Sequence, residues 1–169
     1  MRGLVTFTID TPQGVLRCAA TRSGLALVAF PGSDWTGQLA RLAKNHGNPK
    51  EDRDHPAARQ IREYVAGKRQ KFEFPLDLEL ATPFARKVLT NLARLPAGKV
   101  TTYGALAKDS GRPKGARAVG GAVGSNPIPV VIPCHRVVGS TDLGGFGGGL
   151  PMKRWLLQLE GLDPAALPR

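Results

Sequence analysis

The sequence contains few cysteines and aromatic residues, and it has no long apolar run. Its two cysteines, Cys18 and Cys134, are too few for the disulfide framework of a small secreted protein, so we expect both thiols to be free. No apolar stretch approaches the roughly 18 residues that a membrane-spanning helix needs. There is also no basic and apolar leader before a small-residue cleavage site. We therefore expect a cytoplasmic protein with no membrane partner.

Acidic residues are also scarce, with 13 against 24 basic ones, which gives a formal net charge of +11. Residues 1–80 contain twelve basic and nine acidic side chains, whereas residues 81–169 contain twelve and four, so most of the excess lies in the second half. A basic surface gains affinity for nucleic acid by releasing counterions from phosphates. A solvated basic face without a partner is the alternative, and charge alone does not decide between the two.

The first half of the chain has the pattern of a small α+β domain. Alternating apolar residues and a central turn predict antiparallel strands over residues 4–30. Two amphipathic helices follow, with Ser33 and Asp54 as the expected N-caps. Apolar residues alternate again over residues 72–80, which predicts a half-buried strand, and Pro75 within it indicates a sheet edge or bulge.

From residue 82 the pattern changes to helices with short joints rich in glycine and proline, so we divide the chain into domains 1–80 and 81–169. The second domain should be mainly helical. A short helix over residues 103–108 and another from about residue 113 to residue 124 are joined tightly, and the latter carries Lys114 and Arg117 near its start. This arrangement fits a DNA-binding helix-turn-helix, with an ordinary αα-hairpin as the alternative.

The helix predicted to end at residue 124 is unusually rich in small residues. Each glycine inside a helix costs about 1 kcal/mol relative to alanine, so a repeated use of glycine needs a reason. Close approach of another backbone is one such reason, and the partner is either a neighbouring protein element or the walls of a DNA groove. The small residues are Gly115, Ala116, Ala118, Gly120, Gly121, Ala122 and Gly124.

A candidate nucleophile, Cys134, lies beside His135 in the apolar, β-branched run of residues 130–139. A thiol in an apolar site normally has a raised pKa and is inert, so reactivity needs a partner that favours the thiolate, and His135 is the adjacent candidate. Successive side chains of an extended segment point to opposite faces. The two could pair only if the backbone turns sharply, and Pro133 is compatible with such a turn.

Several motifs together resemble those of the O6-alkylguanine-DNA alkyltransferases. The resemblance covers roughly residues 82–161, and the first eighty residues are similar to that family's more variable N-terminal domain. It implies a ribonuclease-H-like domain with an antiparallel sheet, followed by a winged-helix-like domain with a helix-turn-helix. The motifs are Pro133-Cys134-His135-Arg136-Val137, Asn126-Pro127, Ala116-Arg117-Ala118-Val119-Gly120 and the glycine loop of residues 143–149.

The resemblance implies a DNA repair protein that transfers an alkyl group from O6 of guanine, or from O4 of thymine, to its own cysteine. The substrate would be duplex DNA, bound through the minor groove, with the damaged nucleotide flipped out of the stack. Each molecule would act once, as a monomer and without a cofactor. Some relatives bind zinc in the N-terminal domain, but Cys18, His46 and His55 have no tight ligand spacing here, so we expect no metal. Whether binding along DNA is cooperative is left open.

The resemblance also implies roles for individual residues in the reaction. Cys134 is the nucleophile, and His135 is the base that takes its proton through a water molecule. Glu160 orients the histidine, Asn126 braces the turn at the active site, and Tyr103 protonates the departing guanine. A thiol paired with a histidine and a carboxylate can displace an alkyl carbon without a metal, and a phenol near the base can act as a general acid.

A second set of residues is implied in DNA binding and in the base pocket. Arg117 would fill the gap left by the flipped base. Phe146 and Gly147 stand where the family often has a tyrosine and a serine or glycine, so we expect stacking to be retained and polar recognition to be slightly weaker. The other implied DNA-binding residues are Thr102, Lys114, Ala116, Gly120 and Gly124, and the base-pocket residues are Val137, Phe146, Gly147 and Gly148.

Three other functions are compatible with the sequence. One is a lesion sensor similar to the alkyltransferase-like proteins, which bind damaged DNA but lack the nucleophile. Another is a hydrolase that uses Cys134 and His135, against which the basic second half of the chain counts. The third is a plain DNA-binding module, which would not distinguish damaged from undamaged duplexes.

Overall fold

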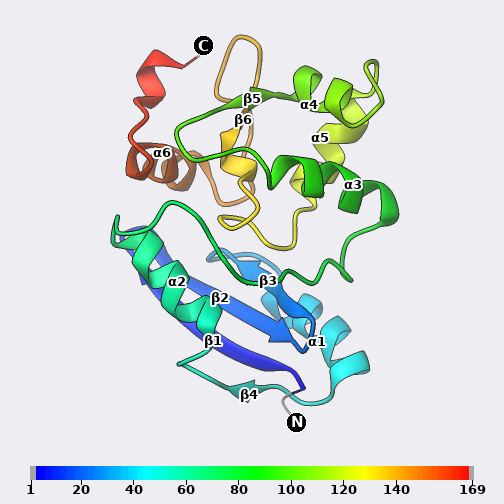
Figure 1. The fold of residues 1–169 in the computed structure, drawn as a ribbon, viewed down its shortest axis with the longest axis vertical. Helices are drawn as coiled ribbons and strands as arrows, with labels where there is room; N and C mark the ends of the chain where they lie inside the picture. Colours follow the sequence, from blue (N-terminus) through cyan, green and yellow to red (C-terminus); the bar gives the residue numbers. More distant parts are fainter. Residues whose placement is uncertain (1–2, 168–169) are drawn as a thin grey trace. The chain divides into compact units, whose positions relative to one another are not determined.

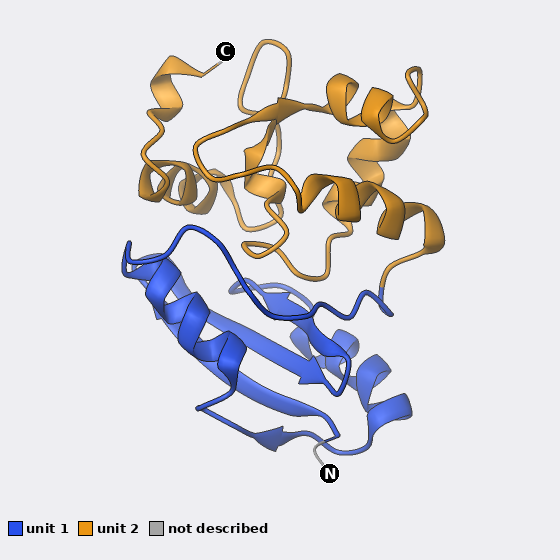
Figure 2. Cartoon of the chain, viewed as in Figure 1, with its two compact units in different colours: residues 1–80 blue, residues 81–169 orange. Residues whose placement is uncertain are grey.

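The computed structural model describes residues 3–167, and the chain forms two compact units, residues 1–80 and residues 81–169 (Figure 2). The first unit contains a four-stranded sheet with two helices, and the second is mainly helical with a small two-stranded sheet (Figure 1). The predicted α+β class is therefore confirmed. Within residues 3–167 no helix is both long and apolar enough to cross a membrane.

The sheet of the first unit consists of β1 (Val5–Thr11), β2 (Gly14–Thr21), β3 (Gly24–Ala29) and β4 (Lys50–Glu51) in the order β3-β2-β1-β4. The first three strands are antiparallel, as the alternation predicted, because tight turns join them in succession. The two-residue β4 pairs in parallel with β1 and was not predicted, since so short a strand has no periodicity to detect.

Two helices, α1 (Trp35–His46) and α2 (Pro56–Val65), pack against this sheet. α2 lies against β1, whereas α1 lies against β2 and β3 (Figure 1). Leu42 of α1 is fully buried with Leu4 and Leu27 of the sheet region. Burial of these apolar faces is the main stabilising contribution to the unit.

Both predicted N-caps of the first unit are wrong by one residue. The carboxylate of Asp34, not the Ser33 hydroxyl, accepts the backbone N–H three residues on, at 3.0 Å. Nδ1 of His55, not Asp54, accepts the N–H two residues on, at 3.1 Å. Proline favours the first helical position, so Pro56 makes the residue directly before it the cap of α2.

The predicted strand over residues 72–80 is also wrong. This extended segment pairs with β3 only at an isolated bridge, where Leu25 donates to the carbonyl of Pro75 at 3.0 Å and accepts from the N–H of Asp77 at 2.8 Å. Proline has no N–H to add to a ladder, so its pairing ability is limited. The segment is held further along by Glu79, whose carboxylate lies 2.7 Å from Nε2 of His46.

The second unit is built around α3 (Pro83–Leu92), α4 (Tyr103–Asp109) and α5 (Ala116–Gly124), which pack on one another. α4 and α5 are joined by residues 110–115 and form the predicted helix-turn-helix pair. The second of them starts later than predicted, because the N–H of Gly115 closes a turn on the carbonyl of Arg112 at 2.8 Å. Lys114 therefore lies in the turn before α5.

A short parallel pair and a 3-10 turn complete the second unit. β5 (Thr101–Thr102) pairs with β6 (Val137–Val138), which directly follows the 3-10 turn η1 (Cys134–Arg136). α6 (Leu150–Leu159) packs against η1, and η2 (Pro164–Ala166) follows α6. The candidate nucleophile thus sits in a turn that is held between a strand and a helix.

Candidate active site

Cys134 is the first residue of a sharp backbone turn, as its pairing with a neighbour would require. Its N–H donates to the carbonyl of Ile132 at 2.8 Å, and the N–H of Arg136 donates to that of Pro133 at 2.9 Å. The thiol is not in a disulfide, and the residue is 8% exposed. The turn places a nearly buried thiol at the end of an apolar segment.

Asn126 shapes the segment that leads into this turn. Its side-chain Nδ2 donates to the carbonyl of Ile132 at 3.0 Å, and its Oδ1 accepts from the N–H of Ile128 at 2.9 Å. Between them, Val130 has a φ of +73°, a left-handed conformation that is strained for a β-branched residue by about 1–3 kcal/mol. The asparagine is therefore a brace for a strained turn.

His135, Glu160 and Arg136 form a buried charged cluster beside the thiol-bearing residue. The carboxylate of Glu160 accepts from Nε2 of His135 at 2.9 Å, and from Nε and Nη2 of Arg136 at 2.7 and 2.8 Å. Glu160 is the C-cap residue of α6, where a negative charge opposes the helix dipole. The guanidinium compensates for that charge, so a glutamate is stable at this helix end.

The hydrogen bonds of His135 determine which ring nitrogen is able to act as a base. Because Glu160 accepts from Arg136 it is a carboxylate, and so Nε2 carries the proton of a neutral ring. Burial lowers the pKa of His135, and the interaction with Glu160 opposes this shift only in part. Within residues 3–167, Nδ1 is buried without a hydrogen-bond partner. A neutral imidazole one residue after Cys134 therefore has an unused lone pair in the protein interior.

The thiol itself is protonated in the resting protein. Burial raises the pKa of Cys134 from 9.0 to about 11, although the side chain of Asn126 and the charge of Lys153 both act to lower it. His135, the partner expected from sequence, is not among the groups that favour the thiolate. A reaction of this thiol at neutral pH would therefore need a group that accepts its proton.

Cys134 opens onto a cavity of about 240 Å³. Tyr103 stands in its wall. Burial raises the pKa of this phenol, and the carboxylate of Asp142 acts in the same direction, as does Cys134 when its thiol is ionised. Five of the predicted reaction and pocket residues thus line one space, whereas His135 and Glu160 do not line it. Its lining residues are Tyr103, Gly120, Val123, Gly124, Asn126, Cys134, Gly145, Phe146 and Gly147.

Two predicted pocket residues, Val137 and Gly148, are not part of this lining. Val137 is fully buried on β6, and its carbonyl accepts from Nζ of Lys153 at 2.8 Å. Gly120 and Gly124, predicted as DNA contacts, line the cavity from α5. The same helix therefore forms a wall of the cavity and part of the outer surface.

The outward face of α5 is made of small residues around Arg117. Ala116, Arg117, Gly121 and Gly124 are exposed, and a side chain at either glycine would point into open space. A neighbouring protein element therefore does not account for Gly121 and Gly124, whereas a side chain at Gly120 would contact the ring of Tyr103. Each of the two explanations considered above thus applies to some of the small residues. Lys114 is exposed beside this face.

Thr102, the remaining predicted DNA contact, has a structural role. Its hydroxyl accepts from the N–H of Ala105 at 3.1 Å and so caps α4. The side chain is half-buried, in the β5 pairing with β6.

Sequence reasoning missed two charged residues of the site, Lys153 and Arg136. Lys153 is fully buried, and burial lowers its pKa to about 8. It shares the buried stripe of α6 with Met152 and Leu156, and this helical spacing was a signal that the side chain faces inward. Arg136 lies in the motif of residues 133–137. A charged side chain within an apolar run needs a buried partner of opposite charge, and this was the signal for its role.

The fold and the site together define a helix-turn-helix protein with a cysteine-centred cavity, and known proteins share this combination. Residues 83–162 match the family model described as 6-O-methylguanine DNA methyltransferase, DNA binding domain. A methylated-DNA--protein-cysteine methyltransferase of Mycobacterium tuberculosis is 38% identical over 154 residues, which cover 90% of each chain. One of Methanosarcina acetivorans is 37% identical over 153 residues, covering 90% of this chain and 95% of the relative.

Solved structures agree with these sequence relatives. The crystal structure of Mycobacterium tuberculosis O6-methylguanine methyltransferase superimposes with a TM-score of 0.80 at 36% identity, covering 98% of this chain and 95% of the other. The crystal structure of Mycobacterium tuberculosis OGT in complex with DNA gives a TM-score of 0.78 at 37% identity, covering 96% and 95%. The chain belongs to the methylated-DNA--protein-cysteine methyltransferase family.

Proposed function

We propose that this protein repairs DNA by moving one alkyl group from O6 of guanine, or from O4 of thymine, onto its own Cys134. The carrying observation is that a nearly buried thiol shares one cavity with a phenol and an aromatic ring, those of Tyr103 and Phe146. The names of its relatives, and the DNA bound by one of them, support the same activity. The thiol is consumed, so each molecule acts once and needs no cofactor.

In the proposed reaction Sγ of Cys134 attacks the alkyl carbon, forming a thioether as the bond from that carbon to O6 breaks. The thiol proton passes through a water molecule to Nδ1 of His135, whose other nitrogen already donates to Glu160. The carboxylate stabilises the imidazolium that forms, as in other nucleophile–histidine–carboxylate arrangements. The base thus lowers the barrier that a thiol pKa of about 11 would otherwise impose.

Guanine leaves poorly as an anion, and Tyr103 is the proposed proton donor to it. Its raised pKa keeps the phenol protonated at neutral pH. Phe146 provides the surface on which the base stacks, and Gly147 offers only its backbone N–H for recognition of O6. The guanine therefore leaves the alkyl group as a neutral base, and it remains attached to the DNA strand.

The proposed DNA-binding surface is the outward face of α5 together with the turn before it. Arg117 enters the stack to fill the gap left by the extruded nucleotide, which offsets an unstacking cost of a few kcal/mol. The small residues Ala116 and Gly124 allow the helix to approach the minor groove closely. The N-cap residue of α5, Gly115, has no side chain to cap the helix, so the first N–H groups of α5 are free to donate to a phosphate. Lys114 adds a positive charge beside them.

The proposal further places the protein in the cytoplasm as a monomer bound to double-stranded DNA. The formal excess of basic residues in residues 81–169 supports a polyanionic partner. We expect the affinity for duplex DNA to fall steeply as the salt concentration rises. A flat salt response would count against phosphate contacts.

The test is the intact mass of the protein before and after incubation with a duplex that carries one O6-methylguanine, followed by peptide mapping. We expect one added methyl group on Cys134, with repair stopping at one lesion per molecule. The matched control is Cys134→Ala, which should bind the lesion without a change in mass. Lesion-selective binding by the wild type without methylation would indicate a sensor, and repeated cleavage of an ester or amide would indicate a hydrolase.

A further inference from the structure

The loop between β6 and the glycine-rich segment folds back on itself, so that Gly139 and Gly144 lie in close contact. A Cβ placed on Gly144 would lie 3.3 Å from the backbone nitrogen of Gly139. Gly144 has a φ of +72°, a left-handed conformation that favours glycine. The loop is therefore closed at its base by two residues that have no side chain.

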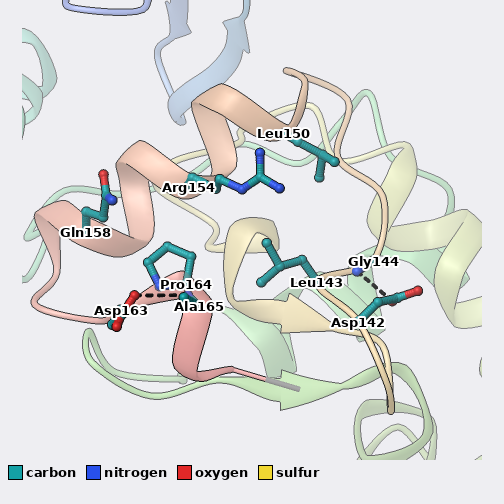
Figure 3. Close-up of a pocket in the computed structure, with 9 residues that line it drawn as sticks. All are labelled: Asp142, Leu143, Gly144, Leu150, Arg154, Gln158, Asp163, Pro164 and Ala165. Carbon is teal, nitrogen blue, oxygen red and sulfur yellow. Dashed lines mark hydrogen bonds between the residues drawn. The ribbon is translucent and has the colours of Figure 1, made fainter. Parts of the chain in front are cut away.

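The carboxylate of Asp142 holds this closure. Its Oδ1 accepts from the N–H of Gly144 at 2.8 Å (Figure 3). A side chain at Gly139 would collide with the same oxygen, so the absence of one there leaves room for the carboxylate. Asp142 thus holds Gly144, and its carboxylate lies in the space beside Gly139.

Lys153 holds the same turn through its carbonyls. Its buried ammonium donates to the carbonyls on either side of Gly144, those of Leu143 and, at 3.3 Å, of Gly145. It also donates to the carbonyl of Val137 on β6. One anion and one cation therefore fix the backbone around Gly144 with respect to the strand that follows the nucleophile.

Gly144 in turn lies directly against Tyr103. A Cβ on Gly144 would lie 3.3 Å from Cε2 of the ring and 3.4 Å from its hydroxyl oxygen. The opposite edge of the ring faces Gly120 of α5, where a Cβ would lie 3.8 Å from Cδ1. The phenol is thus held between two glycines, one on a helix and one on the loop that Asp142 closes.

We infer that Asp142 is a positioning residue that seats Gly144 against Tyr103 and so directs the hydroxyl of Tyr103 into the cavity. The inference rests on the proposed function, in which Tyr103 donates the proton to the departing base. Proton transfer depends on distance and alignment. A loop that no longer confines the ring of Tyr103 should therefore lower the rate of methyl transfer, but not the affinity for DNA.

The experiment compares single-turnover methyl transfer and DNA affinity in variants of the full chain. We expect Asp142→Ala to transfer about tenfold more slowly than wild type, with an unchanged Kd for the duplex. Asp142→Asn keeps an oxygen acceptor for Gly144 and should restore most of the rate. Asp163→Ala is the matched control. Asp142 and Asp163 both line a surface pocket of about 610 Å³, and Asp163 also accepts a local backbone N–H, at 2.9 Å, but it does so at η2 rather than in the loop (Figure 3).

A double-mutant cycle with Tyr103→Phe separates positioning from a general effect on the fold. In the Tyr103→Phe background, Asp142→Ala should slow transfer by less than about twofold, because the hydroxyl to be positioned is absent. A wild-type rate of methyl transfer in Asp142→Ala would overturn the inference. So would an equal reduction of the rate by Asp142→Ala in the wild-type and Tyr103→Phe backgrounds. Wild-type protein that gains no methyl would instead refute the proposed function, so the two failures are distinguishable.

Discussion

Replacing Glu160 with glutamine tests the buried charged cluster directly. In the wild type its carboxylate accepts two hydrogen bonds from the guanidinium of Arg136 and one from His135, and all three residues are buried. An amide keeps the shape of the side chain but removes the charge. Glu160→Gln therefore leaves the guanidinium buried without a counter-charge and the histidine without its carboxylate.

Breaking a buried ion pair from one side costs about 3–5 kcal/mol. For a protein of this size each kcal/mol lowers Tm by about 2–4 °C, so we expect Tm to fall by roughly 10 °C. Fluorescence of Trp155 on α6 in a Trp35→Phe background reports unfolding of the second unit, since the chain has only these two tryptophans. Methyl transfer should fall at least about 10²-fold, the lower end of the contribution of a general base.

A second substitution distinguishes the two roles of Glu160. Adding Arg136→Met to Glu160→Gln removes the unpaired guanidinium, so much of the lost stability should return while transfer remains slow. A single Glu160→Gln variant that unfolds and transfers like the wild type would refute this account of the cluster. Equal recovery of stability and transfer in the double variant would refute the separate role in the reaction.

Three further predictions concern DNA, the turn and the thiol. Arg117→Ala should impair repair of duplex DNA more than demethylation of free O6-methylguanine, and equal loss in both assays would contradict its role in base extrusion. Asn126→Ala should lower the free energy of unfolding by about 1–3 kcal/mol in urea, because it leaves backbone groups of the turn unpaired, and an unchanged value would contradict the bracing role. In a Cys18→Ala background, alkylation of Cys134 by iodoacetamide should keep rising towards pH 11 instead of levelling near pH 9. Because the folded state holds this thiol proton more tightly, its contribution to stability is complete below about pH 9 and is lost as pH rises through 11.

The sequence predicted the elements with strong periodicity and missed those determined by distant contacts. The antiparallel strands of residues 4–30 were predicted from their apolar alternation, and the helix-turn-helix pair from two short helices that are tightly joined. Residues 72–80 alternate in the same way, yet only Leu76 pairs with the sheet. Alternation shows that a segment is extended and half-buried, but it does not show whether a partner strand is available.

The site shows the same division between local pattern and distant contact. The sequence singled out Cys134 and His135 as neighbours in an apolar run, but it did not indicate the groups that lower the pKa of the resting thiol. The side chains that lower the thiol pKa belong to Asn126 and Lys153, which reach Cys134 through the fold, and backbone groups of Cys134 and Val130 act in the same direction. Glu160 could be placed beside the histidine only through the family resemblance, because its position at a helix end indicates an exposed charge.

The composition of the α5 surface has a consequence for how damage is found. Apart from Arg117, the exposed side chains of this helix between Ala116 and Gly124 are methyl groups or hydrogens, which offer no hydrogen bonds to base edges. Sequence is read mainly through such bonds, so if α5 binds DNA as proposed, its small residues do not favour one stretch of duplex over another. On the proposed function we then expect scanning to depend little on sequence, and we expect selectivity to come from the cavity, which would test each base that enters it for a transferable group.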